Sequence, residues 1–311
     1  MLRLRYRAVI RTLYACNGLL HFLQQPVFFR GINMKRVLLF LCAVIMLVSL
    51  WGCAYEESSF SYDAVVKENP YFVHALGGDN GYAYLNSMDV MEKKYANGFR
   101  LFEGDATLTS DGKLVMTHRW NKKNIDTYLG LIYDKNNPVP TYAEFMEWKL
   151  QGSYKATSFL EVLDFMREHK DIVLMLDSGL TESEEAKKFY ETVLQEAGED
   201  CEVLDRVMLS ASNEKVLETG LAVYDFNLRN FYINKEENRS EGLKTTEEII
   251  AYCKKMKCQS CSVSTAVVTE EMCKAFEEAG LYLFVFTTND QEEADRLLQF
   301  GATSIGTDFL G

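Results

Sequence analysis

Two histidines of this 311-residue chain stand where two predicted β-strands end. His74 closes the run Tyr-Phe-Val-His, and His118 closes the run Leu-Val-Met-Thr-His. If both strands belong to a β/α barrel, their carboxyl ends lie at the same mouth, where such barrels hold their active sites. Two imidazoles on either side of a scissile group suit a general acid and a general base. A structural role for each histidine is the alternative.

Three carboxylates occupy comparable positions. Glu103 and Asp105 are two residues apart on a predicted strand, so their side chains point to the same side. Asp177 ends an otherwise apolar strand. Carboxylates that converge repel one another unless a proton or a cation lies between them, and oxygen ligands suit Mg²⁺ or Ca²⁺. The alternatives are solvated strand ends, or ion pairs with Arg100 or Arg119.

The elements that must position these side chains alternate along the chain. From about residue 70, short β-rich runs are separated by helical segments with capping signals, which predicts βα units and a parallel sheet. Eight strands in about 240 residues favour an α/β fold of the (β/α)8 TIM-barrel type, with a doubly wound open sheet as the alternative. The candidate strands are residues 71–76, 99–103, 172–177, 207–210, 230–233, 260–264, 281–287 and 303–307.

One unit departs from this alternation. Ser-Asp-Gly at 110–112 is a hairpin turn signal, so the second strand should continue into a hairpin whose return arm ends at His118. Residues 120–157 then form a long excursion with a short helix from Tyr142. In a barrel, a hairpin and loop insertion after strand 2 would lie over the carboxyl-terminal face as a lid or rim.

With these motifs the chain resembles the glycerophosphodiester phosphodiesterase family over about residues 70–311. His74 stands where the family begins its His-Arg-Gly motif, residues 98–105 resemble its stretch ending in Glu-x-Asp, and residues 108–118 resemble Leu-Thr-x-Asp-Gly-x-x-Val-x-x-His. The resemblance implies a TIM barrel that hydrolyses glycerophosphodiester-type P–O bonds with a divalent cation, Ca²⁺ or Mg²⁺. The implied cation ligands are Glu103, Asp105 and Asp177, and the implied acid/base pair is His74 and His118.

The chain departs from the family pattern at several positions. Ala75 replaces an arginine that helps to bind phosphate, Leu85 replaces a glutamate, and Gly179 replaces a lysine. Two cationic phosphate ligands of the family are therefore missing. We predict that Arg119 supplies one of them, since a guanidinium binds phosphate through two parallel hydrogen bonds.

Three more residues are predicted to contact substrate. Gly77 and Gly78 would let a loop approach the phosphate with backbone N–H groups. Trp120 offers a ring that can stack on a sugar or line a lipid path, with packing as its alternative role. The predicted ligand is a phosphodiester small molecule, an envelope polymer or a lipid headgroup.

The amino-terminal segment has the features of a targeting signal. Lys35 and Arg36 precede an apolar run over residues 37–50, and Leu-Trp-Gly then leads into Cys53, as in a bacterial lipoprotein signal. We therefore expect an extension and signal peptide over residues 1–52, a tether over 53–69 with Cys53 lipidated, and a barrel domain over 70–311. Because Met34 directly precedes Lys35, where a signal peptide should begin, we expect residues 1–33 to be an upstream extension from a misassigned start. The alternative is an uncleaved anchor that begins nearer residue 1. In each case the body would be exported and held on the outer face of the membrane.

The charge of the chain is unevenly distributed. The chain holds 33 basic and 45 acidic residues, and seven of the basic ones lie in residues 1–52 with no acidic residue. The remainder thus carries 26 basic against 45 acidic residues, a net charge of −19. A body this acidic would repel nucleic acid, whose binding depends on neutralising phosphates. Such a charge can attract divalent cations, or it can serve mainly solubility.

Cysteine spacing gives a weaker signal. Cys253, Cys258 and Cys261 are close in sequence but lack a second cysteine pair and a nearby histidine, so a zinc site is not favoured. Small buried apolar roles or one disulfide are the expected uses of these thiols.

Three functional readings remain open from the sequence. The leading one is a metal-dependent phosphodiesterase acting on glycerophosphodiesters. The second is a phospholipase-like enzyme that forms a cyclic phosphate. The third is a non-catalytic binding lipoprotein, motivated by the missing cationic residues.

Overall fold

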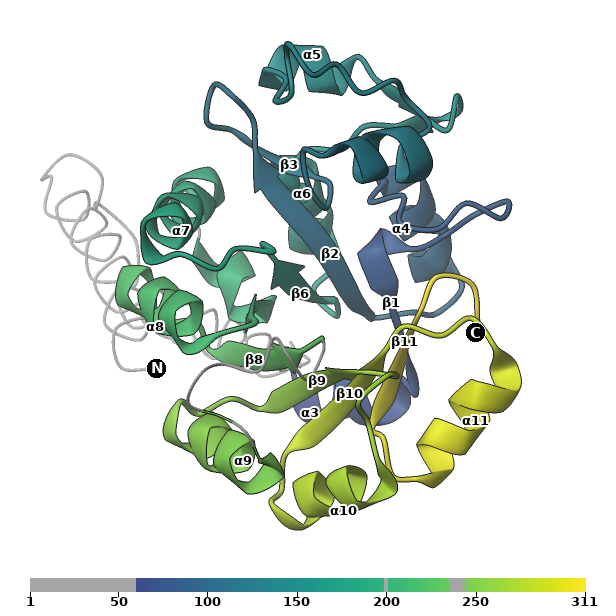
Figure 1. The fold of residues 1–311 in the computed structure, drawn as a ribbon, viewed down its shortest axis with the longest axis vertical. Helices are drawn as coiled ribbons and strands as arrows, with labels where there is room; N and C mark the ends of the chain where they lie inside the picture. The colour runs from purple at the N-terminus through teal and green to yellow at the C-terminus, as the bar shows by residue number, and fades with distance from the viewer. Residues whose placement is uncertain (1–59, 199–200, 235–242, 244) are drawn as a thin grey trace, which may run out of the picture. The chain divides into compact units, whose positions relative to one another are not determined.

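Eight parallel strands form a closed barrel in the computed structural model, which describes residues 60–198, 201–234, 243 and 245–311 (Figure 1). Each strand pairs with the next, and β1 pairs with both β11 and β2, so the sheet closes on itself. This closure confirms the predicted TIM barrel and rules out the open sheet. The barrel strands are β1 (Tyr71–Val73), β2 (Leu101–Leu108), β6 (Val173–Asp177), β7 (Val207–Ala211), β8 (Leu228–Ile233), β9 (Ser260–Ser264), β10 (Tyr282–Phe286) and β11 (Ser304–Thr307).

Helices connect successive strands and surround the barrel (Figure 1). Ser158 and Thr245 each begin a helix with a capping box, as their Ser/Thr-x-x-Glu sequences predict. The apolar faces of the helices pack against the outer faces of the strands in one large core. The connecting helices are α4 (Met88–Ala96), α6 (Phe159–Glu168), α7 (Ser183–Ala197), α8 (Glu214–Val223), α9 (Thr246–Lys255), α10 (Glu270–Glu278) and α11 (Gln291–Gln299), with the 3₁₀ segment η3 (Cys201–Arg206) after α7.

The first strand is shorter than its sequence suggests. β1 ends at Val73, and the 3₁₀ turn η1 (His74–Leu76) follows, in which Ala75 and Leu76 have φ values of 48° and 53°. The β-rich composition of this run did not reveal the turn. This 3₁₀ turn bends the chain at the barrel mouth, directly after the strand, at His74.

A helix closes the amino-terminal end of the barrel. The segment that we expect to belong to the tether includes α3 (Tyr62–Glu68), which begins with Ser61 as its cap. Tyr62 and Val66 of this helix are buried against residues at the starts of the strands, among them Phe72. The barrel domain therefore includes residues before 70, because α3 covers apolar side chains at this end of the barrel.

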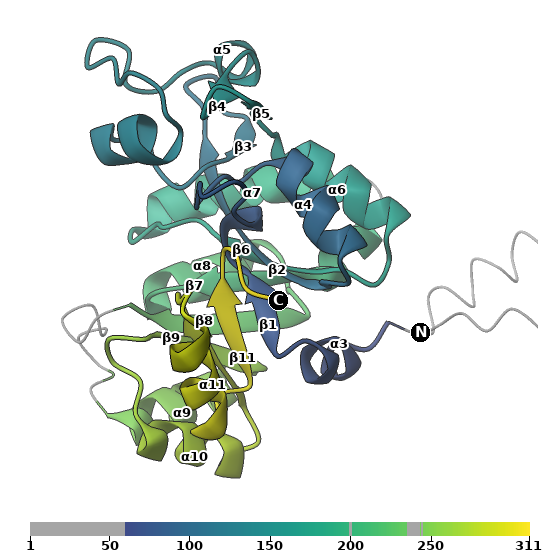
Figure 2. The same ribbon diagram turned by 90° about the vertical axis from the view of Figure 1, so that its right-hand side faces the viewer.

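The predicted hairpin and insertion follow β2. β2 continues into antiparallel pairing with β3 (Leu114–Met116), which confirms the hairpin. The insertion stands above the rest of the barrel in Figure 2 and has its own apolar cluster, which includes Phe145. Its elements are the π-helical turn η2 (Asn124–Tyr128), the expected helix α5 (Tyr142–Met146), and the short pair β4 (Lys149–Leu150) and β5 (Tyr154–Lys155).

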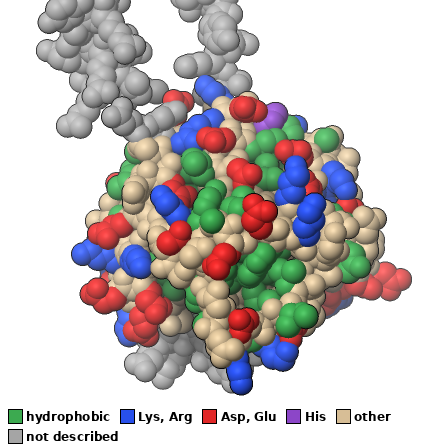
Figure 3. Space-filling model, turned by 90° about the horizontal axis from the view of Figure 1, so that it is seen from above, with side chains coloured by type: hydrophobic (Ala, Val, Ile, Leu, Met, Phe, Trp, Pro, Cys, Tyr) green, Lys and Arg blue, Asp and Glu red, His purple; other side chains and the backbone are tan. Residues whose placement is uncertain are grey.

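Cys53 and the predicted signal segment lie outside the described residues. No helix in the described part of the chain has the length and apolar character needed to cross a membrane. The five cysteines that the structure describes are free thiols, four of them buried. On the face in Figure 3, acidic and basic side chains are interspersed and form no continuous basic stripe.

Candidate active site

A pocket that opens to solvent lies where the barrel strands end. It brings together all five residues predicted to carry the chemistry, although they come from distant parts of the chain. Its lining also includes Arg119 and several residues that the sequence analysis did not single out. The lining residues are Phe72, His74, Tyr84, Glu103, Asp105, His118, Arg119, Met175, Asp177, Ser210, Asn230, Tyr232, Asn234, Ser262 and Phe286.

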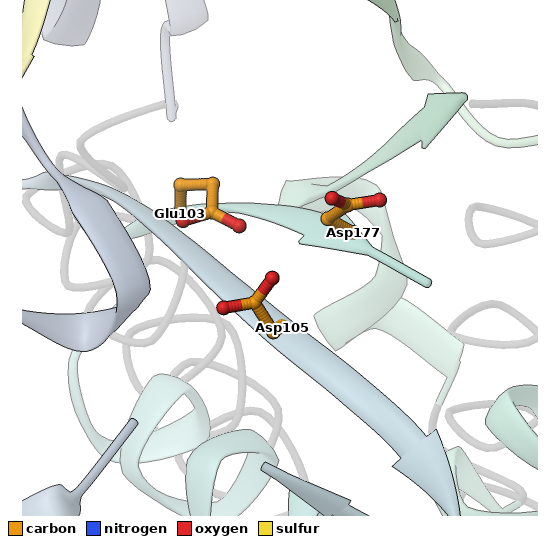
Figure 4. A group of neighbouring side chains, drawn as sticks. All are labelled: Glu103, Asp105 and Asp177. Atoms are coloured by element: carbon orange, nitrogen blue, oxygen red, sulfur yellow. The ribbon is translucent and has the colours of Figure 1, made fainter. Parts of the chain in front are cut away.

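The three predicted carboxylates converge on one point. Glu103 and Asp105 project from β2, and Asp177 projects from the end of the adjacent strand β6 (Figure 4). One carboxylate oxygen from each lies within 4.8 Å of the others. Burial raises the pKa of Glu103 well above its usual value, and the charges of Asp105 and Asp177 raise it further. Burial and then the charge of Asp105 likewise raise the pKa of Asp177.

Hydrogen bonds hold these carboxylates in place while leaving oxygen atoms for a ligand. The N–H of Ala75 donates to Oε2 of Glu103 at 2.7 Å, and Nδ2 of Asn86 donates to Oδ2 of Asp105 at 2.9 Å. Oε1 of Glu103 and Oδ1 of Asp105 are left for a cation. Because mutual repulsion of buried carboxylates is relieved by positive charge, this donor set fits a divalent cation with oxygen ligands.

His74 is oriented by a carboxylate from the last strand segment. Nδ1 of His74 lies 3.1 Å from Oδ1 of Asp308, and both side chains are buried. Nδ2 of Asn289 donates to Oδ2 of the same carboxylate at 2.9 Å. Burial opposes ionisation of Asp308, but the hydrogen bond and charge of His74 hold the pKa of Asp308 below its usual value. With Nδ1 engaged by Asp308, Nε2 of His74 remains for proton exchange with a ligand.

His118 reaches the pocket from the return arm of the hairpin. It follows β3, lines the pocket, and interacts electrostatically with Asp177. The imidazole is half-buried and lies near the ring of Tyr84. The two predicted acid/base residues therefore share one pocket, as expected from strands that end at the same mouth.

Within the described part of the chain, Arg119 is the one lysine or arginine that lines this pocket. Its guanidinium lies beside Gly179 and donates a hydrogen bond to the carbonyl oxygen of that residue. Arg119 is exposed and lines the same pocket as the three carboxylates. A positive group at this place is positioned to meet an anionic ligand.

The two glycines predicted to bind phosphate do not line the pocket, and that prediction is corrected here. The N–H of Gly77 donates to the carbonyl of His74 at 2.8 Å, and the N–H of Gly78 donates to the carbonyl of Asp308 at 2.9 Å. Both groups are therefore already used within the protein. A side chain at Gly77 would collide with Val90, so this glycine serves a tight turn with φ of 107°.

Trp120 also lies away from the pocket and takes the packing role. Its indole Nε1 donates to the carbonyl of Leu108 at 2.7 Å, and its ring packs edge-to-face on Phe145 and Trp148. These contacts anchor the insertion to the hairpin. The predicted contact between Trp120 and substrate is thus corrected.

Uncharged side chains line the opposite side of the pocket. Asn230 on β8 is buried, and its Nδ2 donates to Oγ of Ser210 at 2.9 Å. Oδ1 of Asn230 accepts from Ser260 and Ser262 on β9. Tyr232 lies next to Asp177, and together burial and this carboxylate raise the pKa of its phenol. The pocket is therefore acidic on the side of β2 and β6 and neutral on the side of β7 to β9.

The sequence of residues 78–311 matches the model of the glycerophosphoryl diester phosphodiesterase family. The match covers three-quarters of the chain and every barrel strand after β1. The chain belongs to this family. It is accordingly a phosphoric diester hydrolase with the TIM-barrel fold.

Solved structures show the same barrel. A glycerophosphodiester phosphodiesterase from Thermotoga maritima is 21% identical, with a TM-score of 0.58 over 77% of this chain and 94% of that chain. An Oleispira antarctica phosphodiesterase, solved in complex with the product sn-glycerol-3-phosphate, is 17% identical, with a TM-score of 0.59 over 78% and 95%. A Silicibacter pomeroyi protein described as a glycerophosphoryl diester phosphodiesterase is 18% identical, with a TM-score of 0.64 over 78% and 90%. No curated protein sequence matches this family member.

Several residues of the site escaped the sequence analysis. Asp308 directly follows the last predicted strand, and the rule that strand ends face the barrel mouth could have found it. Asn86 and Tyr84 lie in an irregular loop, where no periodic pattern indicates which side chains face the pocket. Their positions depend on backbone turns that only the folded chain displays.

Proposed function

We propose that this family member hydrolyses glycerophosphodiester-type P–O bonds with the help of a divalent cation and two histidines. The observation that carries the proposal is the convergence of His74, His118 and three carboxylates in one pocket at the carboxyl ends of the strands. A pocket that only binds a ligand has no need of two groups that transfer protons beside a cation site.

Glu103, Asp105 and Asp177 would hold the cation. When bound, a divalent cation there polarises the phosphoryl oxygen and offsets the charge of the phosphodiester. Ala75 and Asn86 keep the first two carboxylates oriented through the hydrogen bonds described above. The choice between Ca²⁺ and Mg²⁺ is part of the experiment below.

The histidines would move the protons of the reaction. One imidazole removes a proton from the attacking water or substrate hydroxyl, and the other donates a proton to the alkoxide that leaves as the P–O bond breaks. Asp308 keeps His74 oriented so that Nε2 is the nitrogen that exchanges the proton. Arg119 would bind a phosphoryl oxygen at the mouth. It would supply positive charge in place of the two cationic residues of the family pattern that Ala75 and Gly179 replace.

The proposed ligand is a small phosphodiester, free or derived from a lipid headgroup or envelope polymer. The product sn-glycerol-3-phosphate bound to the Oleispira antarctica phosphodiesterase supports a ligand of this size and charge. The pocket opens to solvent and holds both histidines and the three carboxylates in its lining, so a small phosphodiester can reach them.

Turnover of defined diesters tests the proposal. Glycerophosphocholine, glycerophosphoglycerol and bis-p-nitrophenyl phosphate are offered to the purified protein with Ca²⁺, with Mg²⁺ and with EDTA, beside His118→Ala and Glu103→Ala. We expect cleavage that EDTA and both substitutions abolish. Cleavage that survives EDTA would overturn the cation requirement. Product analysis shows whether a cyclic phosphate forms, and cation binding without turnover would favour a binding protein.

We further propose that the chain is exported and anchored through a lipid on Cys53, on the outer face of the bacterial cytoplasmic membrane. The order of the segments supports this proposal: a charged pair is followed by an apolar run, and Leu-Trp-Gly-Cys then ends the signal. Metabolic labelling with a radioactive fatty acid should mark the wild-type chain and not Cys53→Ser. Equal labelling of the two would exclude this anchor.

A further inference from the structure

Tyr84 enters the pocket from an irregular loop with an unusual backbone. Its φ of 60° lies in the left-handed region, as does the φ of 45° at Asn86, and both are rare for residues other than glycine. The loop is fastened on both sides of this turn. The N–H of Tyr84 donates to Oδ1 of Asp308 at 3.4 Å, and the N–H of Asn86 donates to the carbonyl of Ala75 at 2.8 Å. The backbone strain is thus held in place next to the site, and it directs the tyrosine ring into the pocket.

Aromatic neighbours fix the orientation of this ring. The ring centroid of Tyr84 lies 4.4 Å from that of His74 and 5.9 Å from that of His118, with interplanar angles of 90° and 82°. Tyr128, from the η2 turn of the insertion, stacks on Tyr84 with centroids 4.6 Å apart and planes 25° from parallel. Tyr84 therefore touches both predicted acid/base residues and is held against them by the insertion.

The hydroxyl of Tyr84 is a hydrogen-bond donor with no assigned acceptor. Among the described residues, this hydroxyl has no hydrogen-bond partner, and the residue lines the pocket. Burial, followed by the charges of Asp105 and Glu103, raises the pKa of the phenol, so it keeps its proton at neutral pH. The protonated hydroxyl thus faces the same region as the carboxylates that would hold the cation.

We propose that the hydroxyl of Tyr84 donates a hydrogen bond to a non-bridging phosphoryl oxygen of the substrate, next to both histidines. The inference rests on the proposed phosphodiesterase function and adds a substrate-contacting residue to it. A phosphoryl oxygen carries negative charge, accepts strongly, and has to lie between the cation ligands and the histidines for the reaction to occur. A donor already fixed by packing can stabilise charge that develops there without reorganising.

The proposal also explains how a site with one lysine or arginine can bind an anion. Arg119 is exposed at the mouth, whereas Tyr84 lies deeper, beside His74. A neutral phenol supplies a hydrogen bond at this depth. An additional guanidinium placed there would have to lose its hydration, at a large cost in free energy. The two residues would thus contact the phosphodiester from different sides.

Tyr84→Phe removes the proposed hydrogen bond and keeps the ring. Tyr128→Phe is the matched control, because it removes a neighbouring hydroxyl from the same stack, and Tyr128 does not line the pocket. We expect Tyr84→Phe to lower kcat/KM by about 10- to 100-fold, the range for a hydrogen bond to a charged acceptor. Tyr128→Phe should match wild type. Both variants should keep the wild-type Tm and the wild-type shape of the pH profile, because the ring contacts with the histidines persist.

A binding measurement separates this inference from the proposed function. The Kd of inorganic phosphate, measured by calorimetry in the presence of the cation, should rise about 10-fold in Tyr84→Phe and stay unchanged in Tyr128→Phe. Wild-type kcat/KM and phosphate affinity in Tyr84→Phe would overturn the role of Tyr84, as would equal losses in both variants. If wild type cleaves no diester, the proposed function fails, but phosphate binding still tests Tyr84.

Discussion

Arg119 occupies the space that a side chain at position 179 would need. Nη2 of Arg119 donates to the carbonyl oxygen of Gly179 at 3.1 Å, and a Cβ added to Gly179 would lie 3.2 Å from the same nitrogen. Gly179 also has a φ of 59°, in the left-handed region. The two residues are 60 positions apart in sequence, and the absence of a side chain at one allows the guanidinium of the other to rest there.

This relationship predicts that Gly179→Ala weakens substrate binding through Arg119. The added methyl group displaces the guanidinium, so KM should rise several-fold, approaching the roughly 10-fold rise expected for Arg119→Ala. In the double variant the effects on KM should not add, because Gly179→Ala acts only through Arg119. Steady-state kinetics on a glycerophosphodiester measure all three.

Gly112→Ala is the control for backbone strain in that experiment. Gly112 has a φ of 77° in the hairpin turn, and a Cβ there meets nothing within 4 Å. It should lose about 1 kcal/mol of stability, like any alanine forced into the left-handed region, and keep its KM. Additive effects of Gly179→Ala and Arg119→Ala on KM would contradict the proposed link.

Cation binding should stabilise the protein more at neutral than at acidic pH. The raised pKa values of Glu103 and Asp177 mean that folding favours their protonated forms, so in the cation-free protein their contribution to stability is present at low pH and lost as pH rises through the raised values. A divalent cation relieves the repulsion of the ionised carboxylates. At a cation concentration about 100-fold above its Kd, the gain is about 2.7 kcal/mol.

Thermal unfolding with Ca²⁺, Mg²⁺ or EDTA measures this gain. The rise in Tm should be larger at about pH 7.5 than at about pH 5, because protons compete for the carboxylates at the lower pH. Glu103→Gln should reduce the rise and should stabilise the cation-free protein at neutral pH. A rise in Tm that is the same at both pH values would argue against these ligands.

Asp308→Asn should lower turnover by disturbing His74. The amide keeps the shape of the carboxylate but loses the negative charge that accepts a hydrogen bond from Nδ1, so the imidazole is no longer held in one tautomer. We expect kcat to fall roughly 10- to 100-fold, as when an outer partner of an active-site group is removed, with KM nearly unchanged.

Asp171→Asn provides the comparison for Asp308. Asp171 pairs with Arg100 away from the pocket, so its neutralisation should affect neither His74 nor His118. It should retain wild-type kcat. The role assigned to Asp308 would be wrong if Asp308→Asn and Asp171→Asn had the same kcat and the same dependence of kcat on pH.

The sequence by itself was enough to predict the barrel and the residues that meet at its mouth, because both depend on local patterns. These patterns involve only residues that are close in the chain. They are the apolar runs of strand length, capping boxes such as that at Ser158, and the turn signal of the hairpin. Once eight such strands close into a barrel, residues at their carboxyl ends must meet. Asp105 and Asp177 are therefore neighbours as a consequence of strand pairing.

Tertiary structure decided which of the remaining side chains reach the pocket. Asp308 meets His74 across 234 positions of sequence, and the N–H of Gly78 is used by that same segment instead of facing phosphate. Trp120 packs between the hairpin and the insertion, because its indole donates to the carbonyl of Leu108 in β2 and contacts two aromatic rings of the insertion. These outcomes depend on contacts between distant segments and on backbone turns at single residues, for which no periodic sequence pattern exists.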